Sequence, residues 1–395
     1  MTAGTKPLSG IRVLDFTQYL PGPLCTQHLA DLGADVVKIE NRKGGDLSRP
    51  TPDGSTSQMF LKVNRNKRSL SIDLRQAEGI EIVRRLARDA DVLVEGFRPG
   101  VMDKLGLGYA ALSALNPRLV YCAITGYGQD GPFREFGGHD INYQSLSGVL
   151  EQSGAAGGPP APGGFQVADI AGGSLTSAMA LLAALVDAQR TGQGRFVDVS
   201  MTDAALACMV MGLSTMDSFG NGKPLPRGED YTSGKLPCYG VYETADGRHV
   251  ALGALEPQFW RAFCDAVQRP DLIAKGWALG ADGDAAKAEI AALIKSRSLR
   301  DWSELLSTVD GCATPVLRLD EVLEHPLTRA RGMVREGLSP EGRPYRQFAF
   351  PVRMSGYRFS VERNPPALGE HNDELLKSLG YGDDDIAALH SKNVA

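Results

Sequence analysis

The sequence predicts an α/β protein in which a doubly wound, Rossmann-like parallel sheet forms a large domain and a smaller α+β domain follows it. Two observations support this. Residues 11–125 alternate between short apolar runs, typical of buried strands, and longer amphipathic runs of helical period. Residues 239–310 instead indicate a hairpin followed by helices, the pattern of a separate α+β unit.

Each expected strand of the large domain is a short, mostly apolar run. The strands are expected at 11–16, 36–39, 69–74, 92–94, 119–125 and 195–199. Helices are expected between them at 21–33, 77–89, within 101–115, at 139–150 and at 170–189. Because a helix separates most consecutive strands, the strands run parallel, and ligands of such sheets bind at the carboxyl ends of the strands.

The domain boundaries follow from changes in composition. We expect the large domain at residues 1–205, completed by about 340–395, and the small domain at 236–330. Between them, 206–235 contains a Gly- and Pro-rich stretch and is predicted to be a linker. Within the small domain, Asp246-Gly247 is a typical hairpin turn.

Composition excludes several classes of protein. Among 395 residues the net charge is -5, and no dense Lys/Arg run is present, so we expect no nucleic-acid partner. The six cysteines show no C-x-x-C spacing, which indicates reduced thiols and no metal site. The most apolar stretch, 178–186, is too short to span a bilayer. We therefore expect a cytoplasmic protein with no membrane partner.

A glycine motif at 126–131 (GYGQDG) matches the dinucleotide pattern G-x-G-x-x-G. That motif needs a helix after it to receive the pyrophosphate, but Pro132 and Phe133 follow instead. The match also falls at the fifth expected strand rather than at the first. We therefore predict no nicotinamide or flavin cofactor.

His139 is the first candidate catalytic residue. It follows Gly137-Gly138, which lets the backbone approach a ligand closely, and it stands at the start of an expected helix. A histidine there can carry protons near neutral pH. Alternatively, Asp140 only caps the helix and His139 is an exposed loop residue.

Two carboxylates are the other candidates. Asp169 precedes the most apolar helix and can act as a base or as a nucleophile toward a thioester. Glu256 precedes Pro257 and can orient a histidine from another part of the chain. For each residue taken alone, a helix N-cap is the simpler interpretation.

Small sets of basic residues lie near the expected strand ends of the large domain. A phosphorylated cofactor needs several such groups. The candidates are Lys38, Arg65 and Arg98. Most lysines and arginines on a protein surface are only solvated, so this observation alone decides nothing.

Taken together, these segments resemble the family III CoA-transferases over nearly the whole chain. The segments that carry the resemblance are 8–15 (LSGIRVLD), 32–40 (LGADVVKIE), 65–70 (RNKRSL), 95–100 (EGFRPG) and 368–376 (LGEHNDELL). Within that family, 138–143 (GHDINY) and 255–259 (LEPQF) are similar to the α-methylacyl-CoA racemase branch. No GGGG run, which the transferase branch carries over its site, is present.

The resemblance implies roles for the candidates. His139 and Asp169 would be the two acid/base groups that invert the α-carbon of a 2-methylacyl-CoA, and Glu256 would pair with His139. Asp169 also aligns with the covalent nucleophile of the transferases, so CoA transfer is the alternative activity. A non-catalytic acyl-CoA-binding protein would need none of the three.

The resemblance also implies a partner and a substrate. Coenzyme A enters as part of the substrate, with no metal and no permanently bound cofactor, and the chain is expected to form an interlocked homodimer. The residues expected to bind the CoA thioester are Lys38, Arg65, Arg98, Gly138, Asp140 and Tyr143.

Overall fold

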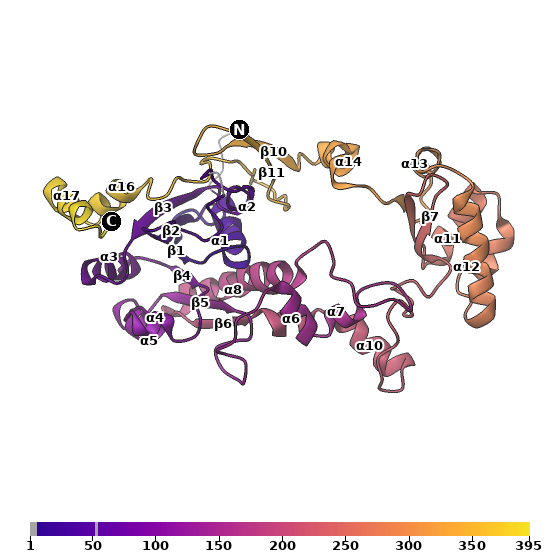
Figure 1. Ribbon diagram of the computed structural model, residues 1–395, viewed down its shortest axis with the longest axis horizontal. Helices are drawn as coiled ribbons and strands as arrows, with labels where there is room; N and C mark the ends of the chain where they lie inside the picture. The colour runs from indigo at the N-terminus through magenta and orange to yellow at the C-terminus, as the bar shows by residue number, and fades with distance from the viewer. Residues whose placement is uncertain (1–5, 52–53) are drawn as a thin grey trace. The chain divides into compact units, whose positions relative to one another are not determined.

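The computed structural model describes residues 6–51 and 54–395, which group into two compact units (Figure 1). The first unit runs up to Ser147 and includes Gly164–Cys208 and Leu327–Ala395. The second consists of Gly148–Gly163 and Met209–Pro326. Most of the predicted linker 206–235 thus belongs to the second unit, where it contains helix α10 (Val210–Phe219).

The first unit is built on a six-stranded sheet in the order β3-β2-β1-β4-β5-β6. All neighbouring strands are parallel. The strands are β1 (Arg12–Phe16), β2 (Asp35–Asn41), β3 (Lys67–Ile72), β4 (Val92–Glu95), β5 (Val120–Thr125) and β6 (Phe196–Ser200). This is the doubly wound order, so the predicted fold class is confirmed, and the strand order reverses between β1 and β4.

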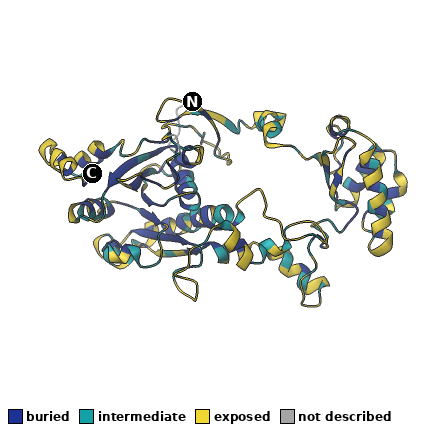
Figure 2. Ribbon diagram, viewed as in Figure 1, coloured by how far each residue is buried: buried dark blue, intermediate teal, exposed yellow. Residues whose placement is uncertain are grey.

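Helices cover both faces of the sheet, which explains why strands β1 to β5 are almost entirely buried, while the edge strand β6 is partly exposed (Figure 2). On one face lie α1 (Pro21–Asp31) and α8 (Thr176–Thr191). The other face carries α3 (Ala77–Arg88), α4 (Val101–Lys104) and α5 (Tyr109–Leu115), and the core there also contains residues of α16 (Asn372–Ser378) and α17 (Asp383–Ser391). The C-terminal residues therefore complete the core of the first unit.

Shorter elements of the first unit surround this sheet. They are α2 (Gln58–Val63), α6 (Asp140–Leu146), the π-helix Ala168–Leu175, α9 (Met201–Ala207), α15 (Pro326–Ala330, which begins at the unit boundary) and the antiparallel hairpin β10 (Val334–Leu338) and β11 (Pro344–Phe348). Arg65 fixes this hairpin, because its guanidinium donates to Gln347 Oε1 (3.0 Å) and to the Phe348 carbonyl (2.7 Å).

The π-helix and α8 run on without a break from Ala168 to Thr191. By length and composition alone this segment is apolar enough to cross a membrane, a test that core helices of globular proteins also pass. It packs against α1 and β5 on one side, while Leu175, Met179 and Val186 are exposed on the other. The apolar segment is thus longer than the predicted run 178–186.

The second unit contains a three-stranded antiparallel sheet with helices packed on it. Its strands are β7 (Tyr239–Glu243), β8 (His249–Gly253) and β9 (Ala313–Pro315). Its helices are α7 (Val149–Gln152), α10, α11 (Pro257–Ala266), the 3-10 helix Pro270–Lys275, α12 (Gly280–Lys295), α13 (Leu299–Leu306) and α14 (Leu319–Glu324). Trp260, Phe263 and Trp302 are the large buried side chains of its core.

Candidate active site

A cleft of about 310 Å³ opens at the carboxyl ends of β1, β4 and β5, where the strand order reverses. It is lined by the loop 17–22 after β1, by 96–99 after β4 and by 137–139 before α6. His139 and Asp169 both line it. The fold therefore brings together the two residues that the sequence singled out as acid/base groups.

His139 is exposed and occupies the N-cap position of α6. Its N–H donates to Asn142 Oδ1 (3.0 Å), which fixes the backbone that carries the imidazole. Asp140 is the first residue of the helix, so the interpretation of Asp140 as the N-cap is wrong. The helix predicted at 139–150 is two helices, because Gly148 has a φ of +81° between them.

Asp140 joins the two candidate catalytic segments. Its Oδ1 accepts hydrogen bonds from the N–H groups of Ala168 (2.8 Å) and Asp169 (3.1 Å), and its Oδ2 accepts from Gln144 Nε2. The first turn of α6 is thereby fastened to the first turn of the π-helix. Both oxygens of this carboxylate, which the sequence predicted to bind the CoA thioester, thus accept hydrogen bonds from groups of the protein itself.

Asp169 lies in the π-helix, a rare local geometry that occurs often at functional sites. The pKa of Asp169 is raised to about 6; burial is the largest cause, the charge of Asp140 adds to the rise, and His139 opposes it. A carboxylate with that pKa is a stronger base than an ordinary aspartate and is still mostly ionised at pH 7.

Two glycines allow the π-helix its close packing. A Cβ on Gly172 would lie 2.9 Å from the Met201 carbonyl oxygen, and one on Gly173 would lie 2.7 Å from Pro21 Cβ. In the sequence, the pair Gly172-Gly173 indicated that the backbone approaches a neighbouring group closely. It did not indicate that the helix would be a π-helix.

Tyr143 and Gly138 shape the turn before His139. The Tyr143 hydroxyl donates to the Gly138 carbonyl (2.5 Å), and a Cβ on Gly138 would lie 2.7 Å from the tyrosine ring. Burial raises the pKa of Tyr143, so its hydroxyl stays protonated and remains a donor. Both residues were predicted to bind the CoA thioester, and both line the cleft. The hydrogen bond between them fixes the turn that carries the neighbouring histidine.

The three predicted cations lie in different surroundings. Arg98 is exposed, lines the cleft and makes no ion pair with any carboxylate of residues 6–51 or 54–395. Lys38 is fully buried and paired with Asp46 (2.8 Å), while Arg65 is buried and paired with Asp31 (2.6 Å). These contacts correct the predicted role of Lys38 and Arg65 in CoA binding, because neither cation faces the cleft.

Glu256 belongs to the second unit, where it takes the N-cap position of α11 without a side-chain capping bond. This placement leaves its carboxylate uncommitted to its own helix. The pairing of Glu256 with His139 stays a prediction.

A second cavity of about 220 Å³ lies beside the cleft at the ends of β1 to β4. The two share Thr17, Gln18 and Phe97 as lining residues, and the second is also lined by residues 72–75. The two cavities therefore adjoin along the carboxyl edge of the sheet. The second is bordered by Arg75, which the sequence did not single out and whose guanidinium pairs with Asp73 (2.8 Å). The described part of the chain holds no cluster of three or more His, Cys, Asp or Glu side chains suited to a metal.

Comparison with known proteins agrees with this architecture. The profile of CoA-transferase family III matches residues 8–372. The chain is 36% identical over 389 residues to α-methylacyl-CoA racemase of Mus musculus, covering 98% of this chain and 97% of the relative. It is 35% identical over 389 residues to succinate–glutarate CoA-transferase of Agrobacterium fabrum, covering 94% of this chain and 96% of the relative.

Among solved structures, a CaiB/BaiF family protein from Brucella suis superimposes with a TM-score of 0.81 at 31% identity, covering 95% of this chain and 100% of that one. Racemases and transferases are thus about equally similar to the chain. On the match over residues 8–372, the chain belongs to CoA-transferase family III and is an enzyme of its transferase and racemase class.

Proposed function

We propose that this enzyme racemises 2-methylacyl-CoA thioesters by moving a proton at the α-carbon. The observation that carries the proposal is one cleft lined by His139 and Asp169, whose segments are fastened to each other through Asp140. Inverting a carbon beside a thioester carbonyl requires one group to remove a proton and a second group to return one to the other face.

The surroundings of each group fit that division of labour. Asp169, with its pKa raised to about 6, removes the α-proton of one enantiomer, and His139 protonates the opposite face. The enolate oxygen formed between these steps is stabilised by N–H groups at the start of α6. Reversing the roles of the two groups converts the other enantiomer.

The rest of the substrate is proposed to extend from the cleft into the adjoining cavity. Arg98, exposed in the cleft, is the candidate for a CoA phosphate, and the adjoining cavity suits the remainder of the nucleotide. Glu256 is proposed to orient His139 from the second unit. No metal and no resident cofactor enters this mechanism.

CoA transfer is the second candidate, and the similarity to succinate–glutarate CoA-transferase favours it. In that reaction Asp169 attacks the thioester carbonyl and releases the CoA thiolate, leaving a mixed anhydride. The thiolate then attacks the aspartyl carbonyl, which gives an aspartyl-CoA thioester and frees the first acid. An acceptor carboxylate then attacks the aspartyl-CoA carbonyl and releases the CoA thiolate, which gives a second mixed anhydride. The thiolate attacks the acceptor's carbonyl in that anhydride, forming the new CoA thioester and freeing Asp169.

Hydrogen exchange distinguishes the two reactions. Incubated with a 2-methylacyl-CoA in deuterated water and no acceptor acid, a racemase incorporates deuterium at the α-carbon. Label that appears only after a free carboxylic acid is added, with CoA moving to that acid, would overturn the racemase proposal.

Substitutions test the individual roles. His139→Ala should abolish racemisation but leave exchange of one enantiomer, and Asp169→Asn should leave the opposite exchange. Glu256→Gln should cost about 10- to 100-fold, because an orienting group tunes the histidine without touching the substrate. A transferase instead loses all activity in Asp169→Asn, and hydroxylamine trapping followed by mass spectrometry then finds Asp169 modified.

We further propose that the enzyme is a cytoplasmic homodimer. The exposed apolar side chains of the π-helix and α8 support an interface between two copies, since contiguous apolar surface is uncommon on monomeric proteins.

A further inference from the structure

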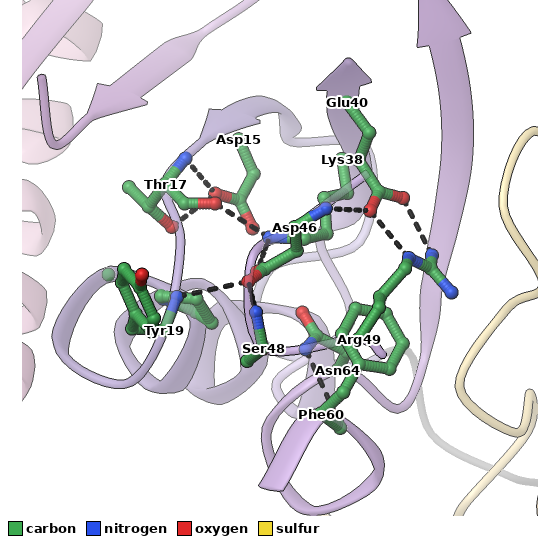
Figure 3. A network of polar contacts seen from close by, with 12 residues as sticks. Asp15, Thr17, Tyr19, Lys38, Glu40, Asp46, Ser48, Arg49, Phe60 and Asn64 are labelled. Carbon is green, nitrogen blue, oxygen red and sulfur yellow. Dashed lines mark hydrogen bonds and ion pairs between the residues drawn. The ribbon is translucent and has the colours of Figure 1, made fainter. Parts of the chain in front are cut away.

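A cluster of buried charged side chains lies directly behind the loop 17–22 that lines the cleft (Figure 3). Asp15 and Lys38 are fully buried, and Asp46 is almost so. Buried ion pairs add little net stability because desolvation offsets their attraction. Their position behind a substrate-facing loop therefore calls for another explanation.

The cluster holds the loop by its backbone. Lys38 Nζ donates to the Thr17 carbonyl (2.7 Å) and pairs with the Asp46 carboxylate (2.8 Å). Asp46 Oδ1 accepts the Tyr19 N–H (3.1 Å), and Asp15 Oδ1 accepts the Thr17 N–H (2.9 Å). The loop is thus fixed at Thr17 and at Tyr19 by charged groups that have no contact with solvent.

Tyr19 adopts a backbone conformation that needs such a restraint. Its φ is +63°, in the left-handed region that side chains other than glycine rarely occupy. Tyr19 is 45% exposed, so its ring is only partly packed. The hydrogen bond from the Tyr19 N–H to Asp46 Oδ1 (3.1 Å) joins this backbone to the buried cluster.

The same cluster reaches the C-terminal segment of the chain. Glu40 Oε1 accepts the Asp46 N–H (3.0 Å), and Glu40 Oε2 accepts the Ser69 hydroxyl (2.6 Å). The Gly369 N–H donates to that hydroxyl oxygen (2.9 Å). A continuous hydrogen-bonded path therefore connects residue 369 to the loop that faces the substrate.

We propose that Lys38 and Asp46 are positioning residues that hold the loop 17–22, with Tyr19 left-handed, in the shape that binds the acyl-CoA. The inference rests on the proposed function, because it assigns a CoA thioester to the cleft. Lys38 lines neither cavity, and Asp46, which borders the second one, is only 1% exposed and is bonded to Lys38 and to the Tyr19 N–H. Their loss should weaken substrate binding while the fold is retained.

The first experiment removes both charges together, so that no buried charge is left unpaired. In Lys38→Met/Asp46→Ala, the Kd for 2-methylbutanoyl-CoA, measured by calorimetry, should rise roughly 10-fold, the factor expected when a left-handed residue loses its restraint. Adding Tyr19→Gly should restore part of the affinity, because glycine adopts that φ without help. If Lys38 and Asp46 only stabilised the fold, adding Tyr19→Gly would not lower the Kd.

The matched control is the buried ion pair Arg65–Asp31 at the C-terminal end of α1, whose hydrogen bonds do not reach the loop 17–22. Arg65→Met/Asp31→Ala should lower the melting temperature without raising the Kd. An unchanged Kd in Lys38→Met/Asp46→Ala, or no recovery on adding Tyr19→Gly to a folded protein, would overturn the proposal.

A second comparison covers the case in which the paired variant does not fold. Tyr19→Asn and Tyr19→Val both remove the phenol, but asparagine tolerates positive φ and β-branched valine does not. The Kd of Tyr19→Val should exceed that of Tyr19→Asn by roughly 10-fold; equal values would overturn the proposal. Wild-type protein that binds no 2-methylbutanoyl-CoA would overturn the proposed function and this inference together, whereas tight wild-type binding with unaffected variants would overturn the inference alone.

Discussion

At the scale of single residues, Asp140 affects Asp169 through its hydrogen bonds and through its charge. Its carboxylate fixes the backbone N–H of Asp169, and its negative charge adds to the burial that raises the pKa of Asp169. These effects separate by substitution, because asparagine keeps an acceptor oxygen and loses the charge.

Asp140→Asn should therefore shift the pH profile. Exchange of the enantiomer that Asp169 deprotonates falls in the wild type as pH drops through about 6, because protonation removes the base. Without the nearby negative charge the pKa of Asp169 is lower, so activity should persist to lower pH. Initial rates of deuterium exchange between pH 4.5 and 8 give the midpoint.

Asp140→Ala is the control for the hydrogen bonds. It removes the charge and the acceptor together, so exchange should fall at every pH, by more than in Asp140→Asn at pH 8. A midpoint that stays near 6 in Asp140→Asn would show that its charge has no part in setting the pKa of Asp169.

At the scale of secondary structure, the end of β4 holds a carboxylate in an unfavourable environment. Glu95 is buried and accepts the Phe97 N–H (2.7 Å). The pKa of Glu95 is raised to about 7; burial is the largest cause, the hydrogen bond from the Phe97 N–H opposes the rise, and the charge of Asp103 adds to it. The folded protein thus holds this proton more tightly than the unfolded chain does.

This raised pKa fixes the sign of a stability effect. Below the ordinary glutamate pKa, Glu95 is protonated in both the folded and the unfolded protein, so it does not reduce the free energy of unfolding. As the pH rises toward 7, Glu95 ionises first in the unfolded chain, and the free energy of unfolding falls. Glu95→Gln should therefore raise the melting temperature at pH 8 and leave it nearly unchanged at pH 4. Glu304→Gln, at an exposed position of α13, should change neither value. An equal gain for Glu95→Gln at both pH values would contradict the assignment.

The elements differ in how far the sequence determined them. The buried strands were predictable because each is a compact apolar run with helical segments around it, and β1, β4 and β5 lie within one or two residues of the expected bounds. The π-helix was not, because it depends on Gly172 and Gly173 meeting Met201 and Pro21, which are distant in sequence. A local pattern does not contain that contact.

The same distinction applies to the candidate site. Residue type and flanking glycines made His139 and Asp169 candidates, and the family resemblance then implied their acid/base roles. The fold brings both into one cleft. Lys38 and Arg65 were misassigned because a buried, paired cation and a phosphate ligand are indistinguishable in sequence. Only their partners, Asp46 and Asp31, separate the two roles.

At the scale of the whole molecule, the chain returns to its first unit after completing the second. The segment from Leu327 onward adds the hairpin β10–β11, held by Arg65, and supplies α16 and α17 to the core. The fold of the first unit therefore depends on both ends of the chain. The backbone passes between the two units four times, at 147–148, 163–164, 208–209 and 326–327.

The apolar surface of the π-helix and α8 leads to the last prediction. Leu175, Met179 and Val186 are each about half exposed or more, and Leu206 of the neighbouring α9 is also exposed. Exposed apolar side chains on adjoining elements are typical of an interface between subunits, so we expect a homodimer with twice the 42.2 kDa mass of the chain. Light scattering at micromolar concentration should give that mass for the wild type.

A charged side chain at the centre of this surface should weaken the dimer. Met179→Asp places a carboxylate where apolar contact is expected, and an unpaired charge is costly to bury in an interface. The fraction of dimer should therefore fall on dilution earlier than in the wild type. Leu115→Asp, on the helix α5 that covers the opposite face of the sheet, adds the same charge outside the surface and should leave the dimer intact. A monomeric wild type, or equal weakening by both substitutions, would contradict an interface at α8.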